Sequence, residues 1–113
     1  MNCSISTTPD FDKAMKNLAK RYASIKDDYA QLLKNLKDNP LMGTPLGHNM
    51  RKVRMAITAK GKGKSGGARV ITHNVILKTE KAHTTLIYAY DKSDRANITD
   101  NELTELLRKN GFL

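Results

Sequence analysis

The spacing of apolar residues changes character once along this 113-residue chain, and that change constrains the fold more than any other feature. Between residues 9 and 39, apolar side chains recur every three or four positions, which is the spacing of one face of an α-helix. Between residues 51 and 90 they alternate or form β-branched runs, which is typical of strands. Because the apolar faces of a helix pair must be covered, we expect the second half to supply a sheet that covers them.

Two amphipathic helices are predicted before the main part of the sheet. Thr8 precedes Pro9 as an N-cap of the first helix, and Ser24 to Asp27 resembles a capping box at the start of the second. The second helix is expected to end at Asn39-Pro40. The two apolar stripes consist of Phe11, Ala14, Met15, Leu18, Ala19 and Tyr22, and of Ile25, Tyr29, Leu32, Leu33 and Leu36. The short connection between the helices predicts an antiparallel hairpin.

Four strands are predicted around these helices. Residues 3–7 are expected to form a short first strand, and Val53, Met55 and Ile57 alternate with polar or small residues in a second. Residues 68–77 and 84–90 are apolar and β-branched on either side of a polar segment. That arrangement is the pattern of an antiparallel hairpin.

The remaining segments complete one predicted domain over residues 1–113. Residues 40–49 hold two prolines and two glycines and are expected to form an ordered loop. A last helix is predicted from the capping box Thr99 to Glu102 to the stop at Asn110-Gly111. The expected fold is therefore a compact α+β domain of order β-α-α-β-β-β-α. Its twisted, mainly antiparallel sheet is packed by the helical hairpin and the last helix.

Positive charge is concentrated in one segment of the chain. The formal net charge is +9, and the interval from Arg51 to Arg69 contains no Asp or Glu. The basic residues of this interval are Arg51, Lys52, Arg54, Lys60, Lys62, Lys64 and Arg69. A localised cationic surface attracts phosphates through steering and counterion release. The sequence therefore predicts a nucleic-acid partner.

Other function classes are disfavoured by the composition. Cys3 is the only cysteine, so neither an intramolecular disulfide nor a cysteine zinc site is expected. The first residues lack the basic start and long apolar run of a signal peptide or membrane span. Gly63-Lys64-Ser65 resembles the end of a nucleotide-binding P-loop, but Thr58 stands where its first glycine is required. We expect a cytoplasmic protein without a metal, a cofactor or a membrane partner.

Three cations are expected to converge on one face of the sheet. Strand alternation places Lys52 and Arg54 on the face opposite Val53 and Met55. Arg69 opens the next strand with no acid near it in the sequence. On neighbouring antiparallel strands these three cations form a cluster whose repulsion a bound phosphate relieves.

Further candidates surround this cluster. Lys60, Lys62 and Lys64 alternate with glycines and are either a solvated hairpin loop or a grip for a phosphate chain. His73 shares the strand parity of Arg69 and is either an RNA contact or an incidental strand residue. Tyr90 is either a stacking platform for a base or a half-buried strand end, and Lys92 or Arg95 would then contact phosphate.

The chain resembles the RelE/ParE superfamily of toxin–antitoxin toxins, and most of all its RelE-like HigB branch. The likeness is carried by the run Lys62 to Ile71, with weaker support from Thr8 to Phe11, Asn39-Pro40, Arg51 to Arg54 and Tyr90 to Ser93. It implies a compact domain that cleaves messenger RNA in the decoding site of the ribosome. It also implies a cognate antitoxin that holds the toxin inactive and carries a helix-turn-helix domain.

The resemblance also implies catalytic roles. The basic pair of the family pattern falls on Lys52 and Arg54, and the arginine that opens the third strand falls on Arg69. Cleavage requires activation of the 2′-hydroxyl, stabilisation of the pentacoordinate phosphate and protonation of the leaving oxygen. Lys52 is the candidate base, Arg54 and Arg69 would stabilise the phosphate, and a lysine such as Lys92 or the geometry of the bound RNA would supply the acid.

The chain departs from the family pattern at three points, one of which is Thr72-His73, where an aromatic residue is more usual after Arg-Val-Ile. Ser93 stands where relatives have a further arginine, which leaves Lys92 or Arg95 as substitutes. The base-stacking tyrosine that some relatives have near the chain end is missing, and Phe112 is the aromatic residue there. Two alternatives therefore stay open: a ParE-like inhibitor of DNA gyrase, and an RNA-binding module without catalysis.

Overall fold

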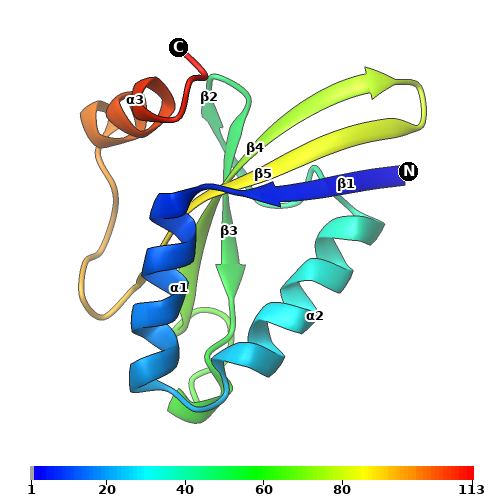
Figure 1. Cartoon of the computed structure of the whole chain (residues 1–113). Helices are drawn as coiled ribbons and strands as arrows, with labels where there is room; N and C mark the ends of the chain where they lie inside the picture. Colours follow the sequence, from blue (N-terminus) through cyan, green and yellow to red (C-terminus); the bar gives the residue numbers. More distant parts are fainter. Residues whose placement is uncertain (1) are drawn as a thin grey trace.

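The chain folds into a five-stranded sheet with helices on both of its faces, and the computed structural model describes residues 2–113 (Figure 1). The elements are β1 (Asn2–Thr7), α1 (Pro9–Arg21), α2 (Ile25–Asp38), β2 (Thr44–Gly47), β3 (Met50–Met55), the 3₁₀ helix η1 (Thr58–Lys60), β4 (Ala68–Lys78), β5 (Lys81–Asp91) and α3 (Asp100–Lys109). The strand order is β1-β5-β4-β3-β2. β1 runs parallel to β5 and every other pair is antiparallel, so the predicted α+β fold is confirmed.

The predicted loop at residues 40–49 was wrong in part, because Thr44–Gly47 forms the edge strand β2. Thr44 and Pro45 lie opposite Lys52 and Arg51 of β3. His48 and Asn49 connect the strands with φ values of 51° and 62°. Two successive residues at positive φ form the tight turn that suits a two-residue hairpin. The pair His-Asn is not the usual Asn-Gly signature, which is why the sequence pattern did not reveal this hairpin.

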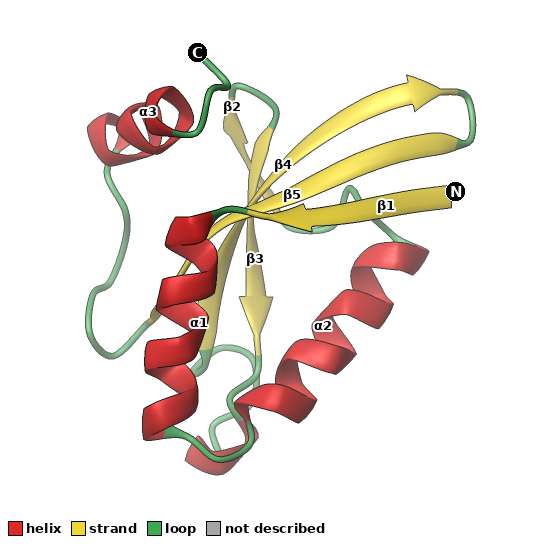
Figure 2. Ribbon diagram, viewed as in Figure 1, coloured by secondary structure: helices red, strands yellow, loops and turns green. Residues whose placement is uncertain are grey.

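Helices α1 and α2 cover one face of the sheet and diverge from their short connection (Figure 2). Thr8 caps α1 as predicted, because its Oγ1 accepts a hydrogen bond of 3.1 Å from the backbone N–H of Phe11. The core between these helices and the sheet consists of Phe11, Met15, Leu18, Ile25, Leu32, Leu36, Val53, Met55, Ile57, Ala68, Val70, Leu86 and Ala89. The helical hairpin therefore packs on the sheet as expected.

The predicted capping box at the start of α2 was wrong. The Ser24 side chain makes no cap hydrogen bond; its hydroxyl donates to Asp28 Oδ2 at 2.7 Å and accepts from the Ala59 N–H at 2.9 Å. Asp28, which is buried, also accepts from the N–H of Thr58 at 3.0 Å. These residues attach the first turn of α2 to η1 instead of closing the helix end.

Helix α3 covers part of the opposite face. Its capping box is present as predicted: Thr99 Oγ1 accepts from the Glu102 N–H at 3.2 Å, and Glu102 Oε1 accepts from the Thr99 N–H at 3.1 Å. Gly111 ends it with a φ of 82°. The core beneath α3 consists of Met50, Ile71, Ile87, Tyr90, Ile98, Leu103 and Leu107. Within residues 2–113, no helix is long and apolar enough to cross a membrane.

Candidate functional site

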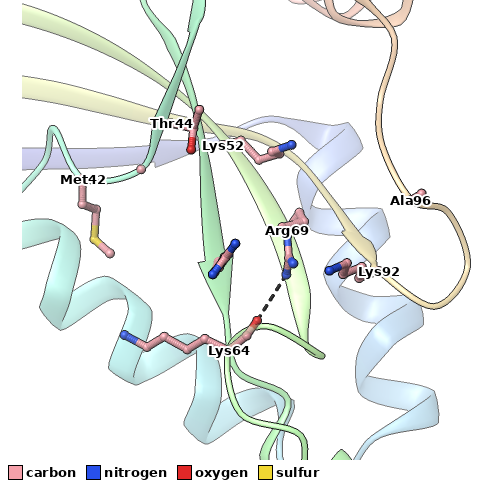
Figure 3. Close-up of a pocket in the computed structure, with 9 residues that line it drawn as sticks. Met42, Thr44, Lys52, Lys64, Arg69, Lys92 and Ala96 are labelled. Carbon is pink, nitrogen blue, oxygen red and sulfur yellow. Dashed lines mark hydrogen bonds between the residues drawn. The ribbon is translucent and has the colours of Figure 1, made fainter.

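An open cleft with a volume of about 390 Å³ lies on the α3 side of the sheet (Figure 3). It is lined by Met42, Gly43, Thr44, Lys52, Arg54, Lys64, Arg69, Lys92 and Ala96. Five of these residues are cationic, and none of the lining that the structure describes is acidic. The cleft therefore has the charge of a polyanion-binding surface.

Strand register brings the predicted cations together. Arg54 of β3 lies directly opposite Arg69 of β4, and Lys52 lies two residues along the same face as Arg54. Val53 and Met55 point to the other face, into the core under α1 and α2. The Lys52 Nζ donates to Asn97 Oδ1 at 3.3 Å. The predicted convergence of Lys52, Arg54 and Arg69 is thus present in the structure.

Arg69 is held by backbone carbonyl groups. Its guanidinium donates to the carbonyls of Lys64 at 3.2 Å, Ala68 at 3.2 Å and Ser65 at 3.0 Å, and the residue is 5% exposed. Within residues 2–113 it forms no ion pair with a carboxylate. Burial, with the neighbouring charge of Arg54, lowers the pKa of Arg69 below its ordinary value. A phosphate bound beside it would relieve this unpaired positive charge.

The lysine loop, residues 61–67, contains two lysines that lie differently relative to the cleft. Lys64 lines the cleft and supplies a carbonyl to Arg69, as the dashed line in Figure 3 marks. Lys62 is exposed on the same loop without lining the cleft. Both positions are compatible with the predicted contact with a phosphate chain.

Lys60 differs, and its predicted role as a free phosphate-gripping lysine is not supported. Its Nζ donates to Asp91 Oδ1 and Ser93 Oγ, each at 2.8 Å, and its side chain is 11% exposed. Asp91 is 1% exposed. Lys60 and Asp91 are 31 residues apart in the sequence, so no local pattern predicts this ion pair. The packing of η1 against the end of β5 brings the two side chains together.

The segment after β5 contributes one cation to the cleft. Lys92 lines it, whereas Arg95 is turned away, with its guanidinium bonded to Glu102 Oε1 at 2.6 Å. Arg95 also covers the Tyr90 ring, 5.5 Å from the ring centroid. Tyr90 is 4% exposed, so the predicted stacking of a base on its ring is not supported. Of the two proposed substitutes for the missing arginine, the geometry favours Lys92.

His73 lies on the same sheet face as Arg69 but outside the cleft. Its ring packs against Phe112 with centroids 4.4 Å apart, and burial lowers its pKa below 6.5. The residue is 9% exposed. His73 and Phe112 therefore cover one another near the chain end. This packing favours the interpretation of His73 as an incidental strand residue over a contact with RNA.

Sequence reasoning missed the walls contributed by β2 and the loop before α3. Gly43, with a φ of 99°, approaches so closely that a Cβ there would lie 2.6 Å from the carbonyl oxygen of Lys52. Thr44 and Ala96 complete the lining. No local pattern marks these residues, although the sequence Gly43-Thr44-Pro45 does signal a turn beside the basic strand.

The arrangement can bind a phosphodiester and stabilise charge that develops on it. Guanidinium groups hold phosphate oxygens through two parallel hydrogen bonds, and lysines add mobile point charges. In residues 2–113, no three His, Cys, Asp or Glu side chains lie grouped as they would to hold a metal ion. The charged groups that line the cleft are the lysines and arginines Lys52, Arg54, Lys64, Arg69 and Lys92.

Comparison with known proteins supports the family resemblance that was noted from the sequence. A family model described as the RelE toxin of the RelE/RelB toxin–antitoxin system matches residues 12–111. No curated protein gives a significant match. The matched range includes most of α1, all of α2, strands β2 to β5, the cleft and α3.

Proposed function

The chain belongs to the RelE toxin family of RelE/RelB toxin–antitoxin systems, and from that premise we propose that it is a ribosome-dependent endoribonuclease that cleaves messenger RNA. The observation that supports this activity is the cleft, where Arg54 and Arg69 face one another across two strands with Lys52 and Lys92 beside them. Binding alone does not require two arginines on one rigid face. Such a preorganised pair of donors does suit the stabilisation of charge that develops on a phosphate in the transition state.

The proposed reaction is an internal transfer at the phosphodiester. The 2′-oxygen forms a bond to phosphorus, the bond from phosphorus to the 5′-oxygen breaks, and the products are a cyclic phosphate and a 5′-hydroxyl. In this scheme the neutral amine form of Lys52 accepts the proton of the 2′-hydroxyl, and the ammonium form of Lys92 donates a proton to the leaving oxygen. Arg54 and Arg69 stabilise the pentacoordinate phosphate.

Replacement of Arg69 tests the central role. We expect Arg69→Ala to lower the rate of cleavage of ribosome-bound messenger RNA by at least about 100-fold, because it removes a preorganised donor to the phosphate. Primer extension on programmed ribosomes measures the rate, and circular dichroism checks the fold. Arg108→Ala is the matched control, since Arg108 is exposed and pairs with Glu105 away from the cleft. Equal rates for the wild type and Arg69→Ala would refute this role.

Substrate and target controls separate this activity from its alternatives. A messenger RNA with a 2′-deoxy nucleotide at the cut site should remain intact, because the attacking oxygen is absent. Cleavage of the deoxy substrate would exclude the proposed chemistry. Intact RNA beside blocked supercoiling by DNA gyrase would indicate the ParE-like alternative, and RNA binding with neither effect would indicate a binding module.

The finer assignments belong to the same proposal. The run Lys62 to Ile71 supports placement in the HigB branch, and action on ribosomes implies a cytoplasmic protein. The cognate antitoxin is expected to carry a helix-turn-helix domain and to cover the cationic cleft or displace α3. A neighbouring gene for a small helix-turn-helix protein, whose product restores translation when expressed with this chain, would support both points.

A further inference from the structure

Asp91 is a buried carboxylate that directly precedes the cleft residue Lys92 in the sequence, but its side chain points away from the cleft. Tyr90, one residue earlier on β5, packs in the core under α3. The Asp91 side chain instead lies at the end of α1, where its Oδ2 accepts from Arg21 Nη2 at 3.1 Å and from the Tyr22 hydroxyl at 2.5 Å. The side chain has no exposed surface. The acid is thereby kept on the opposite face of the sheet from the cations of the cleft.

The second oxygen of this carboxylate holds two segments that border the cleft. Asp91 Oδ1 accepts from Lys60 Nζ at 2.8 Å, from the Ser93 N–H at 2.9 Å and from the Ser93 hydroxyl at 2.6 Å. Lys60 is the last residue of η1 and immediately precedes the lysine loop, residues 61–67. Ser93 follows Lys92 in the turn after β5. One oxygen therefore anchors both the start of the loop and the turn that carries Lys92.

The far end of the loop is attached at the same place. Ala68, which follows the loop, lies opposite Asp91 in the β4–β5 register. The Lys92 N–H donates to the Gly67 carbonyl at 3.1 Å. Residues 61–67 are thus held at both ends by contacts with Asp91 and Lys92. These contacts restrict the conformations that the loop can adopt.

The middle of this closed loop holds the central arginine of the cleft. The carbonyl oxygens of Lys64 and Ser65 accept from Nη1 and Nη2 of Arg69. We propose that Asp91 is a positioning residue: through its ion pair with Lys60 it fixes the carbonyls that orient Arg69, and through Ser93 it fixes Lys92. The inference rests on the proposed function for its kinetic consequence, but the geometric part concerns Arg69 alone.

This arrangement explains how a buried acid serves a cationic site. A carboxylate paired directly with Arg69 would neutralise the charge that a phosphate needs. Asp91 is instead paired with Lys60 and Arg21, and it reaches Arg69 only through backbone carbonyls. Arg69 is thereby held in place without a competing anion, which is what preorganisation for an incoming phosphate requires.

Nuclear magnetic resonance of the arginine side chains provides a test that is independent of activity. In the wild type, the guanidinium protons of Arg69 should exchange slowly because they are bonded to carbonyls and buried. In Asp91→Asn, which removes the charge but little volume, they should lose this protection and their nitrogen signals should shift. Asp10→Asn is the matched control, because it breaks another carboxylate–lysine pair, to Lys109, away from the cleft.

Lys60→Met is the second variant, because Asp91→Asn leaves Lys60 without its charged partner and risks unfolding. It breaks the same link from the other side while Asp91 keeps Arg21, Tyr22 and Ser93. Loss of Arg69 protection in folded Lys60→Met supports the proposal. Unchanged Arg69 signals in Lys60→Met overturn it, whatever the behaviour of Asp91→Asn.

Kinetics complete the test and separate the two proposals. In the folded variants, kcat should fall about 10- to 100-fold while KM for ribosome-bound messenger RNA changes less than about threefold, because a misplaced catalytic group affects the transition state more than binding. A purely structural role would lower the amount of folded protein and leave kcat per folded molecule unchanged. If the wild type fails to cleave, the proposed function fails, but the Arg69 signals still decide whether Asp91 positions this residue.

Discussion

At the scale of single residues, Asp91 links the stability of the fold to pH. Burial by itself raises the pKa of Asp91, but hydrogen bonds from Lys60, Ser93 and Tyr22 outweigh burial and hold the pKa well below its ordinary value of 3.8. A carboxyl group whose pKa is lower in the folded state stabilises the protein above its unfolded pKa, and that contribution is lost as pH falls.

The free energy of unfolding of the wild type should therefore decline as pH falls below about 4. Asp91→Asn should be less stable than the wild type at neutral pH, and its decline should be markedly shallower. The part that remains comes from carboxyl groups such as Asp10 and Glu102, whose pKa values are also lowered. Urea unfolding at a series of pH values measures both slopes, and parallel slopes would contradict the prediction.

At the scale of elements, the junction of β3, the lysine loop and β4 depends on close packing of backbones. A Cβ on Gly67 would lie 2.2 Å from the carbonyl oxygen of Met55 and 2.9 Å from the Ile57 nitrogen. These backbone atoms cannot move aside without separating the two strands that carry Arg54 and Arg69. Glycine is therefore required here because a side chain would clash with these backbone atoms. Backbone conformation is not the reason, since the φ of Gly67 lies outside the left-handed region.

Gly67→Ala should accordingly lower the free energy of unfolding by about 1–3 kcal/mol, the usual cost of forcing extra volume into a packed site. It should also reduce cleavage, because the Gly67 carbonyl holds Lys92. Ser65→Ala is the control in the same loop, since it keeps the carbonyl that binds Arg69 and has an exposed side chain. Thermal unfolding that is equal in the two variants would disprove the steric argument.

Prediction of the elements succeeded where the information is local. The boundaries of α1, α2 and α3 and the caps at Thr8 and Thr99 agree with the structure, because caps and apolar periodicity act within a turn or two. The edge strand β2 and the Ser24 interaction were missed, because each depends on a partner elsewhere in the chain: β3 for the strand and η1 for Ser24. A local sequence pattern cannot show the free energy that a segment gains by pairing with distant residues.

At the scale of the whole molecule, a net charge of +9 predicts binding to RNA that weakens with salt. Lys62 is exposed on the loop and does not line the cleft, so Lys62→Ala should weaken binding and reduce the salt slope by roughly one counterion without lowering kcat. Binding of ribosome-bound messenger RNA between low and moderate salt measures the slope. Lys81→Ala, at the tip of the β4–β5 hairpin, is the control. A fall in kcat for Lys62→Ala would place this lysine in the chemistry instead.

By itself the sequence determined the helices, most of the strands and the side of the sheet that carries Lys52, Arg54 and Arg69. These features follow from side-chain direction, which in a helix or strand depends only on position along the element. Only the tertiary structure decided which cations stay available to bind a phosphate. Lys60 is neutralised by Asp91, Arg95 by Glu102, and Arg69 is held by carbonyls alone. Charge pairing depends on distances between segments far apart in the chain, so composition predicted a cationic surface and folding selected the five cations that line the cleft.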